Sequence, residues 1–390
     1  MFFIKGMVWV IMCLQIEIMN ICFITYMYPG KHDSSSFAFV KQLVDSVAKE
    51  GHHCHVLAPF NITHYRRLSQ SKEEYNCGKG KVTVYRPGYL SFSNWHIGKF
   101  YPSSLSHKRA MKKAFRMLPE KPDVVYGHFW SAGYDGFEYA KANSIPLFVA
   151  SGESEINKLF SPKPNLKEFS DYVKGVICVS SKNREESIQL GLTTADKCEV
   201  FPNAVNAELF HKRDKLECRK QLGLSQDDFI AAFVGWFNER KGPLRVAEAI
   251  GRVGGTKSIF IGKGEQDPQC DGIVFKGALP HEQVPIYLGA ADCFVLPTLH
   301  EGCCNAVVEA MACGLPIVSS NLPFNWDVLD ETNSIMVNPN SIDEIASAIR
   351  TMRDDVNKRK LLAEDALKKA ESLTITQRAK EILRFIEEKC

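Results

Sequence analysis

Short apolar runs alternate with amphipathic stretches along most of the chain. An apolar run bounded by polar or turn-forming residues is typical of a buried β-strand. In the first half this pattern predicts strands at residues 20–27, 55–58, 82–85, 124–126, 147–150 and 175–179. In the second half it predicts strands at residues 229–235, 258–262, 273–276, 293–297 and 317–319.

Between these runs, apolar side chains recur at the three- and four-residue spacing of a helix face. The spacing predicts helices at residues 36–50, 104–118, 304–313 and 376–389. In the first of them Phe39, Leu43 and Val47 share a face, and Gly51 follows as a stop signal.

Strands that alternate with helices predict an α/β fold, in which a parallel sheet is covered by helices on both faces. Residues 201–203 and the charged stretch 210–219 are interpreted as a linker between two such units. We therefore expect two similar open domains that face each other, with a ligand in the cleft at the carboxyl ends of the strands.

Composition narrows the class of protein without naming a function. The 390 residues are 45% apolar and 24% charged, as in an ordinary folded protein with a large core. The 13 cysteines are sparse and irregular, and no C-x-x-C pair occurs. These features exclude a disulfide scaffold, a zinc ribbon, a collagen-like chain and a multispan membrane protein, and favour reduced thiols in the cytosol.

The net charge of +3 is the sum of two halves with opposite net charge. Residues 1–203 hold 25 basic and 18 acidic residues, which leaves 23 basic and 27 acidic residues for the remainder. Residues 64–116 contain twelve Lys and Arg, opposed only by Glu73 and Glu74, with nine aromatic residues among them. This composition suits an anionic membrane, an anionic glycan or a nucleic acid. The alternative interpretation is a solvated positive face that binds no partner.

The N-terminus carries an apolar run of ten residues, 7–16, between Lys5 and Glu17. A spanning helix needs about 20 residues, and no small-residue cleavage site follows this run. We expect residues 1–18 to lie outside the fold, with translation starting at Met19 as one account and a membrane-touching tail as the other.

Residues 296–319 hold the most informative pattern of the chain. A predicted strand is followed by the Glu301-Gly302 loop and then by a helix that Gly314 stops. Free N–H groups at such a helix start form an anion site, and Gly302 permits close approach of a phosphate. Glu309 lies one turn beyond Asn305. Because a carboxylate repels phosphate, we interpret Glu309 as an acceptor of sugar hydroxyls. Two solvent-exposed glutamates on an ordinary helix are the alternative.

The spacing of Glu301 and Glu309 resembles the E-x7-E signature of family-4 retaining glycosyltransferases of the GT-B fold. Further segments resemble motifs of this family in the expected order: 201–205 (the hinge), 234–242 (the phosphate loop), 260–265 (the glycine loop beside the base) and 274–277 with 291–297 (the strand that precedes E-x7-E). Within the family, the chain resembles bacterial transferases of surface polysaccharides and teichuronic acid.

This resemblance implies two Rossmann-like domains that face each other across a cleft, with a C-terminal helix that crosses back to the N-terminal domain. Residues 19–205, together with helix 375–390, would bind the acceptor. Residues 206–374 would bind the nucleotide-sugar donor.

The resemblance also implies roles for individual residues. His128, Glu301 and Lys241 would be catalytic, with Lys241 at the donor diphosphate and Glu301 facing the transferred sugar. The other expected donor contacts are Gly235, Arg240, Gly262, Gly264, Gly302, Cys303, Cys304, Asn305 and Glu309. Gly30, Ser34 and His128 are expected on the acceptor side. For Lys241 and His128, a surface lysine and a satisfied core histidine are the alternatives.

Several positions depart from the family pattern. Trp236 stands where many relatives have arginine, and Arg240 is a candidate for the missing cation. The first loop, 30–36, has one glycine, and Cys303 and Cys304 replace the commoner aromatic residue and glycine. These differences bear on the choice of donor more than on the fold.

The implied reaction is transfer from a UDP- or GDP-linked sugar, with retention at the anomeric carbon, to a glycan or polyprenol-linked acceptor. No D-x-D occurs, so we expect activity without a metal or any cofactor besides the donor. The basic face of helix 103–118 would touch the anionic inner leaflet, which makes the protein cytoplasmic and peripheral on the membrane; no nucleic-acid partner is expected.

Three other functions remain open at this point. A nucleotide-sugar epimerase or a phosphorylase would use a similar two-domain cleft. A non-catalytic protein that binds glycan or membrane would explain the basic segment, but it would not explain Lys241, Glu301 and Glu309. A nicotinamide dehydrogenase is disfavoured, because no predicted strand is followed by G-x-G-x-x-G.

Overall fold

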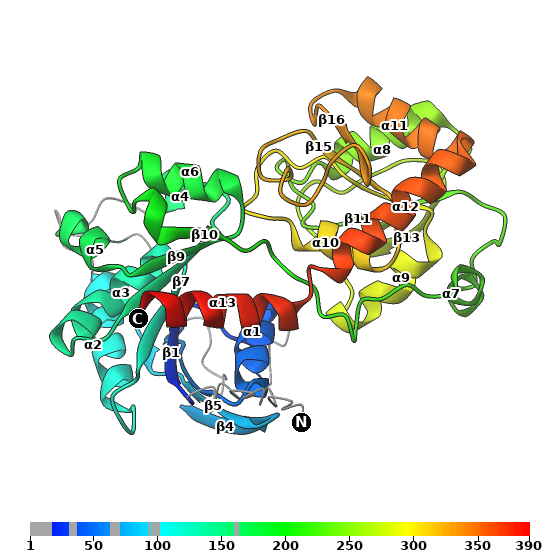
Figure 1. The fold of residues 1–390 in the computed structure, drawn as a ribbon. Helices are drawn as coiled ribbons and strands as arrows, with labels where there is room; N and C mark the ends of the chain where they lie inside the picture. The colour runs from blue at the N-terminus through cyan, green and yellow to red at the C-terminus, as the bar shows by residue number, and fades with distance from the viewer. Residues whose placement is uncertain (1–17, 31–36, 63–70, 93–94, 96–101, 160–163) are drawn as a thin grey trace, which may run out of the picture.

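The computed structural model describes residues 18–30, 37–62, 71–92, 95, 102–159 and 164–390. Its strands form an eight-stranded sheet in the first half of the chain, a six-stranded sheet in the second half, and a two-stranded pair of β3 (Phe60–Asn61) and β6 (Gly88–Tyr89). The two large sheets lie in separate halves of the molecule, each with its own helices (Figure 1). The predicted α/β fold is confirmed.

The first sheet has the order β10-β9-β8-β7-β1-β2-β5-β4 and is parallel except for the β4–β5 pair. Its strands are β1 (Asn20–Ile24), β2 (His53–Leu57), β4 (Lys72–Cys77), β5 (Gly80–Tyr85), β7 (Val124–His128), β8 (Leu147–Ser151), β9 (Gly175–Cys178) and β10 (Cys198–Val200). The six predicted strands are confirmed. The pattern missed the two edge strands, because β4 alternates partly exposed polar residues and β10 spans only three residues.

Helices cover both faces of this sheet. They are α1 (Ala38–Lys49), α2 (Pro102–Arg116), α3 (Trp130–Ala142), α4 (Ile156–Leu159), α5 (Leu166–Tyr172) and α6 (Ser181–Gln189). One face packs against α1 and the C-terminal helix α13 (Ile375–Lys389), and the other packs against α2, α3 and α5. The predicted helices at 36–50 and 104–118 are α1 and α2, and the prediction at 376–389 is α13.

The second sheet has the order β13-β12-β11-β14-β15-β16, and all its strands are parallel. Its strands are β11 (Ile230–Val234), β12 (Lys257–Ile261), β13 (Ile273–Gly277), β14 (Cys293–Leu296), β15 (Ile317–Ser320) and β16 (Ser334–Val337). The helices around it are α8 (Pro243–Val253), α9 (Val284–Ala290), α10 (Asn305–Ala312), α11 (Ile342–Asp354) and α12 (Val356–Glu371). All five predicted strands and the helix at 304–313 are confirmed.

The interpretation of residues 210–219 as a linker is wrong. This stretch leads into helix α7 (Lys215–Leu222), and the Phe210 ring is buried against the second half. The Arg219 guanidinium is also buried and lies 2.7 Å from the Asp292 carboxylate. The charge that suggested an exposed linker instead pairs with a residue more than 70 positions away.

Two segments of the chain connect the halves, and they lie side by side. Val205 forms a parallel bridge with Thr374, and its N–H donates to Leu373 O at 2.8 Å. Helix α13 then returns to the first sheet, where it packs beside α1 (Figure 1). This confirms the predicted crossing of the C-terminal helix.

No helix in the described part of the chain is long and apolar enough to cross a membrane. The first 17 residues lie outside the described residues, so the expectations for the N-terminal extension stay predictions.

Candidate active site

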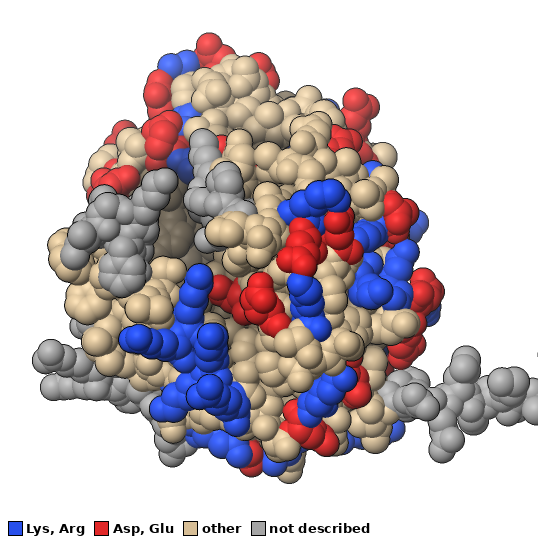
Figure 2. All heavy atoms as spheres, turned by 90° about the vertical axis from the view of Figure 1, so that its left-hand side faces the viewer, with Lys and Arg blue, Asp and Glu red and all other residues tan. Residues whose placement is uncertain are grey.

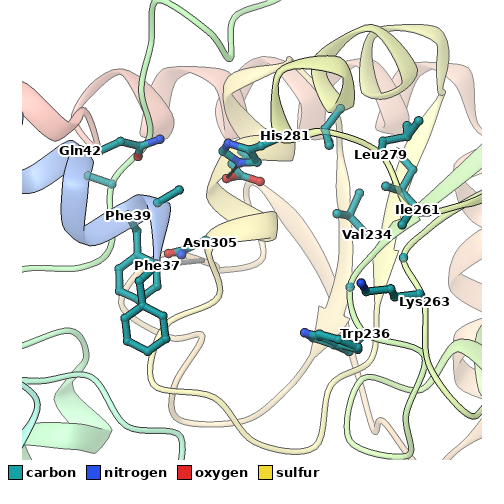
Figure 3. Close-up of a pocket in the computed structure, with 17 residues that line it drawn as sticks. Phe37, Phe39, Gln42, Val234, Trp236, Ile261, Lys263, Leu279, His281 and Asn305 are labelled. Atoms are coloured by element: carbon teal, nitrogen blue, oxygen red, sulfur yellow. Dashed lines mark hydrogen bonds and ion pairs between the residues drawn. The ribbon is translucent and has the colours of Figure 1, made fainter. Parts of the chain in front are cut away.

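Two adjoining cavities lie between the halves of the molecule. One, of about 420 Å³, is lined from the first half by His128, Phe129 and Glu153 and from the second half by Arg240 and Glu301, among others. The other cavity, of about 360 Å³, lies between the start of α1 and the carboxyl edge of the second sheet (Figure 3). Both include Phe39 and Asn305, so they form one continuous cleft.

Glu301 lies at the centre of a cationic cluster. One of its carboxylate oxygens accepts from Arg240, from Lys241 at 2.7 Å and from the Thr298 hydroxyl at 3.0 Å. Arg240 also donates to His300 O at 3.0 Å, which fixes the guanidinium against the loop. Burial alone would raise the pKa of Glu301, but the two cations outweigh it and hold the pKa below its usual value. Glu301 is therefore ionised, and the cluster keeps one net positive charge.

The loop that carries Glu301 approaches the first half closely. A Cβ atom on Gly302 would lie 2.4 Å from Gly152 O, so only glycine fits there. Cys303 O accepts from the Asn203 side chain at 2.9 Å, which joins the loop to the hinge. Cys304 precedes α10, and its sulfur lies 3.6 Å from Lys241 Nζ. Both cysteines are buried, and Cys303 lines the larger cavity, whereas Cys304 lies behind the cavity walls.

Glu309 and Asn305, one turn apart on α10, both line the smaller cavity. A Glu309 oxygen lies 2.9 Å from His281 Nε2. Burial alone would lower the pKa of His281, but the bond to Glu309 outweighs burial and raises it. The sequence did not indicate His281 as a site residue.

The predicted glycine loops meet at the edge of the second sheet. The Gly235 N–H donates to Ile261 O at 3.0 Å, and a Cβ atom on Gly262 would lie 1.9 Å from Gly235 O. A Cβ atom on Gly264 would lie 2.2 Å from Phe237 O. Side chains at Gly262 and Gly264 would separate the two loops, so these glycines are required by loop packing.

Known proteins resemble the chain over both halves. A profile described as Glycosyltransferase Family 4 matches residues 38–209, and one described as Glycosyl transferases group 1 matches residues 228–355. The fold is that of the sucrose-phosphate synthase of Thermosynechococcus elongatus, with a TM-score of 0.77, 18% identity and coverage of 95% of this chain and 98% of that one. The chain belongs to the GT-B glycosyltransferases.

Two relatives of this glycosyltransferase are named for teichuronic acid biosynthesis and for transfer to a diphosphoundecaprenol-linked sugar. A protein of Bacillus subtilis named as a teichuronic acid biosynthesis glycosyltransferase (TuaC) is 27% identical over 85% of this chain and 88% of its own length. The Escherichia coli UDP-Gal:alpha-D-GlcNAc-diphosphoundecaprenol alpha-1,3-galactosyltransferase is 28% identical over 65% of this chain and 72% of its own length. Anabaena HepE, solved with UDP and glucose, shares the fold with a TM-score of 0.69, 17% identity and coverage of 95% and 100%.

On the opposite wall of the glycosyltransferase cleft, His128 ends strand β7. Its ring packs against Phe39 and Phe129, with centroid distances of 5.4 and 4.7 Å. Nδ1 is buried and has no hydrogen-bond partner among the described residues. Burial, assisted by the nearby Arg378 guanidinium, lowers the pKa of His128 to about 3. The imidazole is therefore neutral at physiological pH, which suits a hydrogen bond to a sugar hydroxyl better than proton abstraction.

Glu153 is a buried carboxyl group in the same cavity that the sequence did not indicate. One oxygen accepts from Trp130 N at 2.8 Å and the other from Gly152 N at 3.0 Å. Burial raises the pKa of Glu153 to about 7, although these backbone bonds act in the opposite direction. Its place just after strand β8, at the carboxyl edge of the first sheet, was a usable signal.

The other two residues predicted on the acceptor side are not among the described residues that line the cleft. Gly30 is absent from the walls of the two cavities and lies beside the Arg86 guanidinium, which donates to Pro29 O at 2.7 Å. Ser34 lies outside the described residues. Across the part of the chain that the structure describes, no three His, Cys, Asp or Glu side chains are grouped to hold a metal ion.

Proposed function

We propose that the protein transfers a sugar from a nucleoside diphosphate sugar to a glycan or polyprenol-linked acceptor, with retention, in cell-surface polysaccharide synthesis. One observation carries the proposal: Arg240 and Glu301, which share an ion-pair cluster with the buried Lys241, line a cleft between two Rossmann-like halves, and Glu309 lines the adjoining cavity. The names of the B. subtilis and E. coli relatives support the class of acceptor.

The donor fits the charge distribution of the second half. The diphosphate would lie near Lys241 and Arg240 and near the start of α10, whose N–H groups no side chain caps. Glu309 would accept hydrogen bonds from the ribose hydroxyls, at a distance from the phosphates. We expect a uridine nucleotide first, because the E. coli relative is named for a UDP-linked sugar.

In the reaction, an acceptor hydroxyl oxygen forms a bond to the anomeric carbon while the bond from that carbon to the phosphate oxygen breaks. The hydroxyl proton passes to the departing diphosphate, so the acceptor attacks from the face that the diphosphate leaves. Lys241 and Arg240 stabilise the charge that accumulates on the leaving group. His128, which is neutral and buried, positions the transferred sugar.

We propose that this reaction needs no metal, since the two cations and the helix start can neutralise the leaving group. Transfer in the presence of EDTA should equal transfer without it. Activity that disappears with EDTA and returns with Mg²⁺ or Mn²⁺ would contradict this part of the proposal.

The surface around α2 suits a cytoplasmic enzyme that is peripheral on an anionic membrane. The helix has five exposed cations and no acidic residue: Lys108, Arg109, Lys112, Lys113 and Arg116. Among the described residues these five make no ion pairs, and Lys and Arg gather on this face (Figure 2). Exposed Phe92 and Trp95 pack together near the start of the helix, where Phe92 N donates to Ser103 at 2.8 Å. Cations beside exposed aromatic rings are typical of interfacial binding.

Vesicle sedimentation tests the membrane surface. Binding to phosphatidylglycerol vesicles should exceed binding to phosphatidylcholine vesicles, should weaken as salt rises, and should fall in a Lys112→Glu, Arg116→Glu variant. Equal binding by both vesicle types, or binding that salt leaves unchanged, would refute it.

A screen of nucleotide sugars for protection against thermal unfolding tests the donor site. The protecting nucleotide sugar is then assayed separately for hydrolysis, epimerisation and transfer, which distinguishes the transferase from the epimerase and phosphorylase alternatives. Glu309→Ala should lose protection and transfer while its circular dichroism stays that of the wild type. Full protection of Glu309→Ala by the same nucleotide sugar would contradict the site.

A further inference from the structure

Trp236 and Lys263 form a pair on the wall of the smaller cavity. Trp236 is 57% exposed, which is unusual for so large an aromatic side chain. The Lys263 ammonium lies over its ring, 5.6 Å from the centroid, in the geometry of a cation–π contact. In Figure 3 both side chains line the open space opposite Phe37 and Phe39 of the first half. Trp236 adds little to the core, so its place at the cleft calls for another role.

The backbone holds this pair in place. The N–H of Gly235 donates to Ile261 O at 3.0 Å, and that of Phe237 donates to Lys263 O at 2.9 Å. These bonds continue the β11–β12 ladder past the edge of the sheet, with Trp236 between the two bonded residues. The lysine and the indole are therefore neighbours on paired strands, before any ligand arrives.

Lys263 differs from Lys241 and Arg240 in having no carboxylate partner among the described residues. Lys241 and Arg240 both bind one oxygen of Glu301, so much of their charge is already compensated. Lys263 lines the cavity and makes no ion pair with any carboxylate in the described residues. Gly235, next to Trp236, packs against the Lys241 side chain, since a Cβ atom there would lie 3.4 Å from Lys241 Cδ. The uncompensated ammonium thus lies on the same edge of the sheet as the cationic cluster.

We propose that Lys263, oriented by the Trp236 ring, binds the diphosphate of the donor as a third cation of the site. The inference rests on the proposed function, because it takes a nucleoside diphosphate as the ligand. On binding, the ammonium exchanges its contact with the indole for a phosphate oxygen, and the indole keeps the lysine stem directed into the cleft.

Isothermal titration with uridine diphosphate and with uridine tests this assignment; if the screen selects a guanosine donor, guanosine diphosphate and guanosine take their places. Lys263→Met removes the charge and keeps an apolar stem, so the dissociation constant of the diphosphate should rise about tenfold while that of the nucleoside stays the same. Trp236→Ala should weaken diphosphate binding in the same direction, and Trp236→Phe should restore most of it because phenylalanine keeps a π face. The effect of Lys263→Met should shrink as salt rises.

Matched controls come from exposed residues that line neither cavity of the cleft. Lys220→Met on α7 and Trp326→Phe, whose indole is 58% exposed, should bind both ligands as the wild type does. Equal affinity of Lys263→Met and wild type for the diphosphate would overturn the proposal, and so would an equal loss of diphosphate and nucleoside. If the wild type binds no nucleoside diphosphate at all, the proposed function fails as well, which separates the two outcomes.

Discussion

Replacing Glu153 by glutamine tests whether the cleft wall contains a buried carboxyl group that titrates near neutral pH. The side chain is 6% exposed, and its two oxygens accept backbone N–H groups of Trp130 and Gly152. No cation forms an ion pair with it in the described part of the chain. Burial raises its pKa to about 7, from an ordinary value of 4.5. Glutamine has nearly the same shape and no charge at any pH.

The sign and size of the effect follow from proton linkage. Between pH 4.5 and 7 the folded protein keeps the proton that the unfolded chain has released, so stability falls as pH rises. The contribution is fully present below pH 4.5 and is lost once pH has risen through about 7. A difference of about 2.5 pKa units corresponds to about 3 kcal/mol of unfolding free energy, lost by the wild type across this range but not by Glu153→Gln.

Urea denaturation at pH 5 and at pH 8 measures this difference. The unfolding free energy of Glu153→Gln relative to wild type should rise by about 3 kcal/mol between the two conditions. A Glu199→Gln variant serves as the control, because Glu199 is an exposed glutamate of the same half. Parallel pH profiles for wild type and Glu153→Gln would refute the reasoning, since they would show that Glu153 has the same pKa in the folded and unfolded protein.

Two further predictions concern a buried ion pair of the second half and a contact between the halves. Asp292→Ala leaves the buried Arg219 guanidinium without its carboxylate, so the free energy of unfolding measured in urea should fall by about 3–5 kcal/mol. The exposed Asp343→Ala is the control and should lose less than about 1 kcal/mol. Similar losses in the two variants would contradict this prediction. The Asp327 carboxylate accepts hydrogen bonds from the N–H and the hydroxyl of Ser181 in the other half, at 2.8 and 2.6 Å. Asp327→Ala removes both bonds and should increase the radius of gyration measured by small-angle scattering. An unchanged radius would show that these bonds do not hold the halves together.

The hydrophobic pattern predicted most of the fold, because each sheet is buried on both faces and its strands are short apolar runs. The pattern failed where local composition and tertiary environment disagree. Strand β4 is a polar edge, and α7 has few apolar residues and is fixed by the distant Arg219–Asp292 pair. A pairing across more than 70 residues leaves no periodic trace in the sequence.

Some residues of the candidate site could be predicted from the sequence, and others could not. The resemblance of ordered motifs indicated Lys241, Glu301 and Glu309, and the structure brings the first two to 2.7 Å from each other. Glu153 was missed although it follows a predicted strand, and His281 was missed because its significance lies in a contact with a residue of another helix. A histidine becomes notable only once its ring nitrogen is seen 2.9 Å from a carboxylate in a cavity.

The rate of sugar transfer by Lys241→Ala tests the central claim most directly. With the nucleotide sugar that protects the wild type, the variant should fold normally by circular dichroism and lose about 100- to 1000-fold in kcat, the usual effect of removing one preorganised group that stabilises a developing negative charge. Lys220→Ala, an exposed lysine on α7, should keep the wild-type rate. Wild-type turnover by Lys241→Ala would show that the leaving diphosphate does not lie at the Lys241–Glu301–Arg240 cluster.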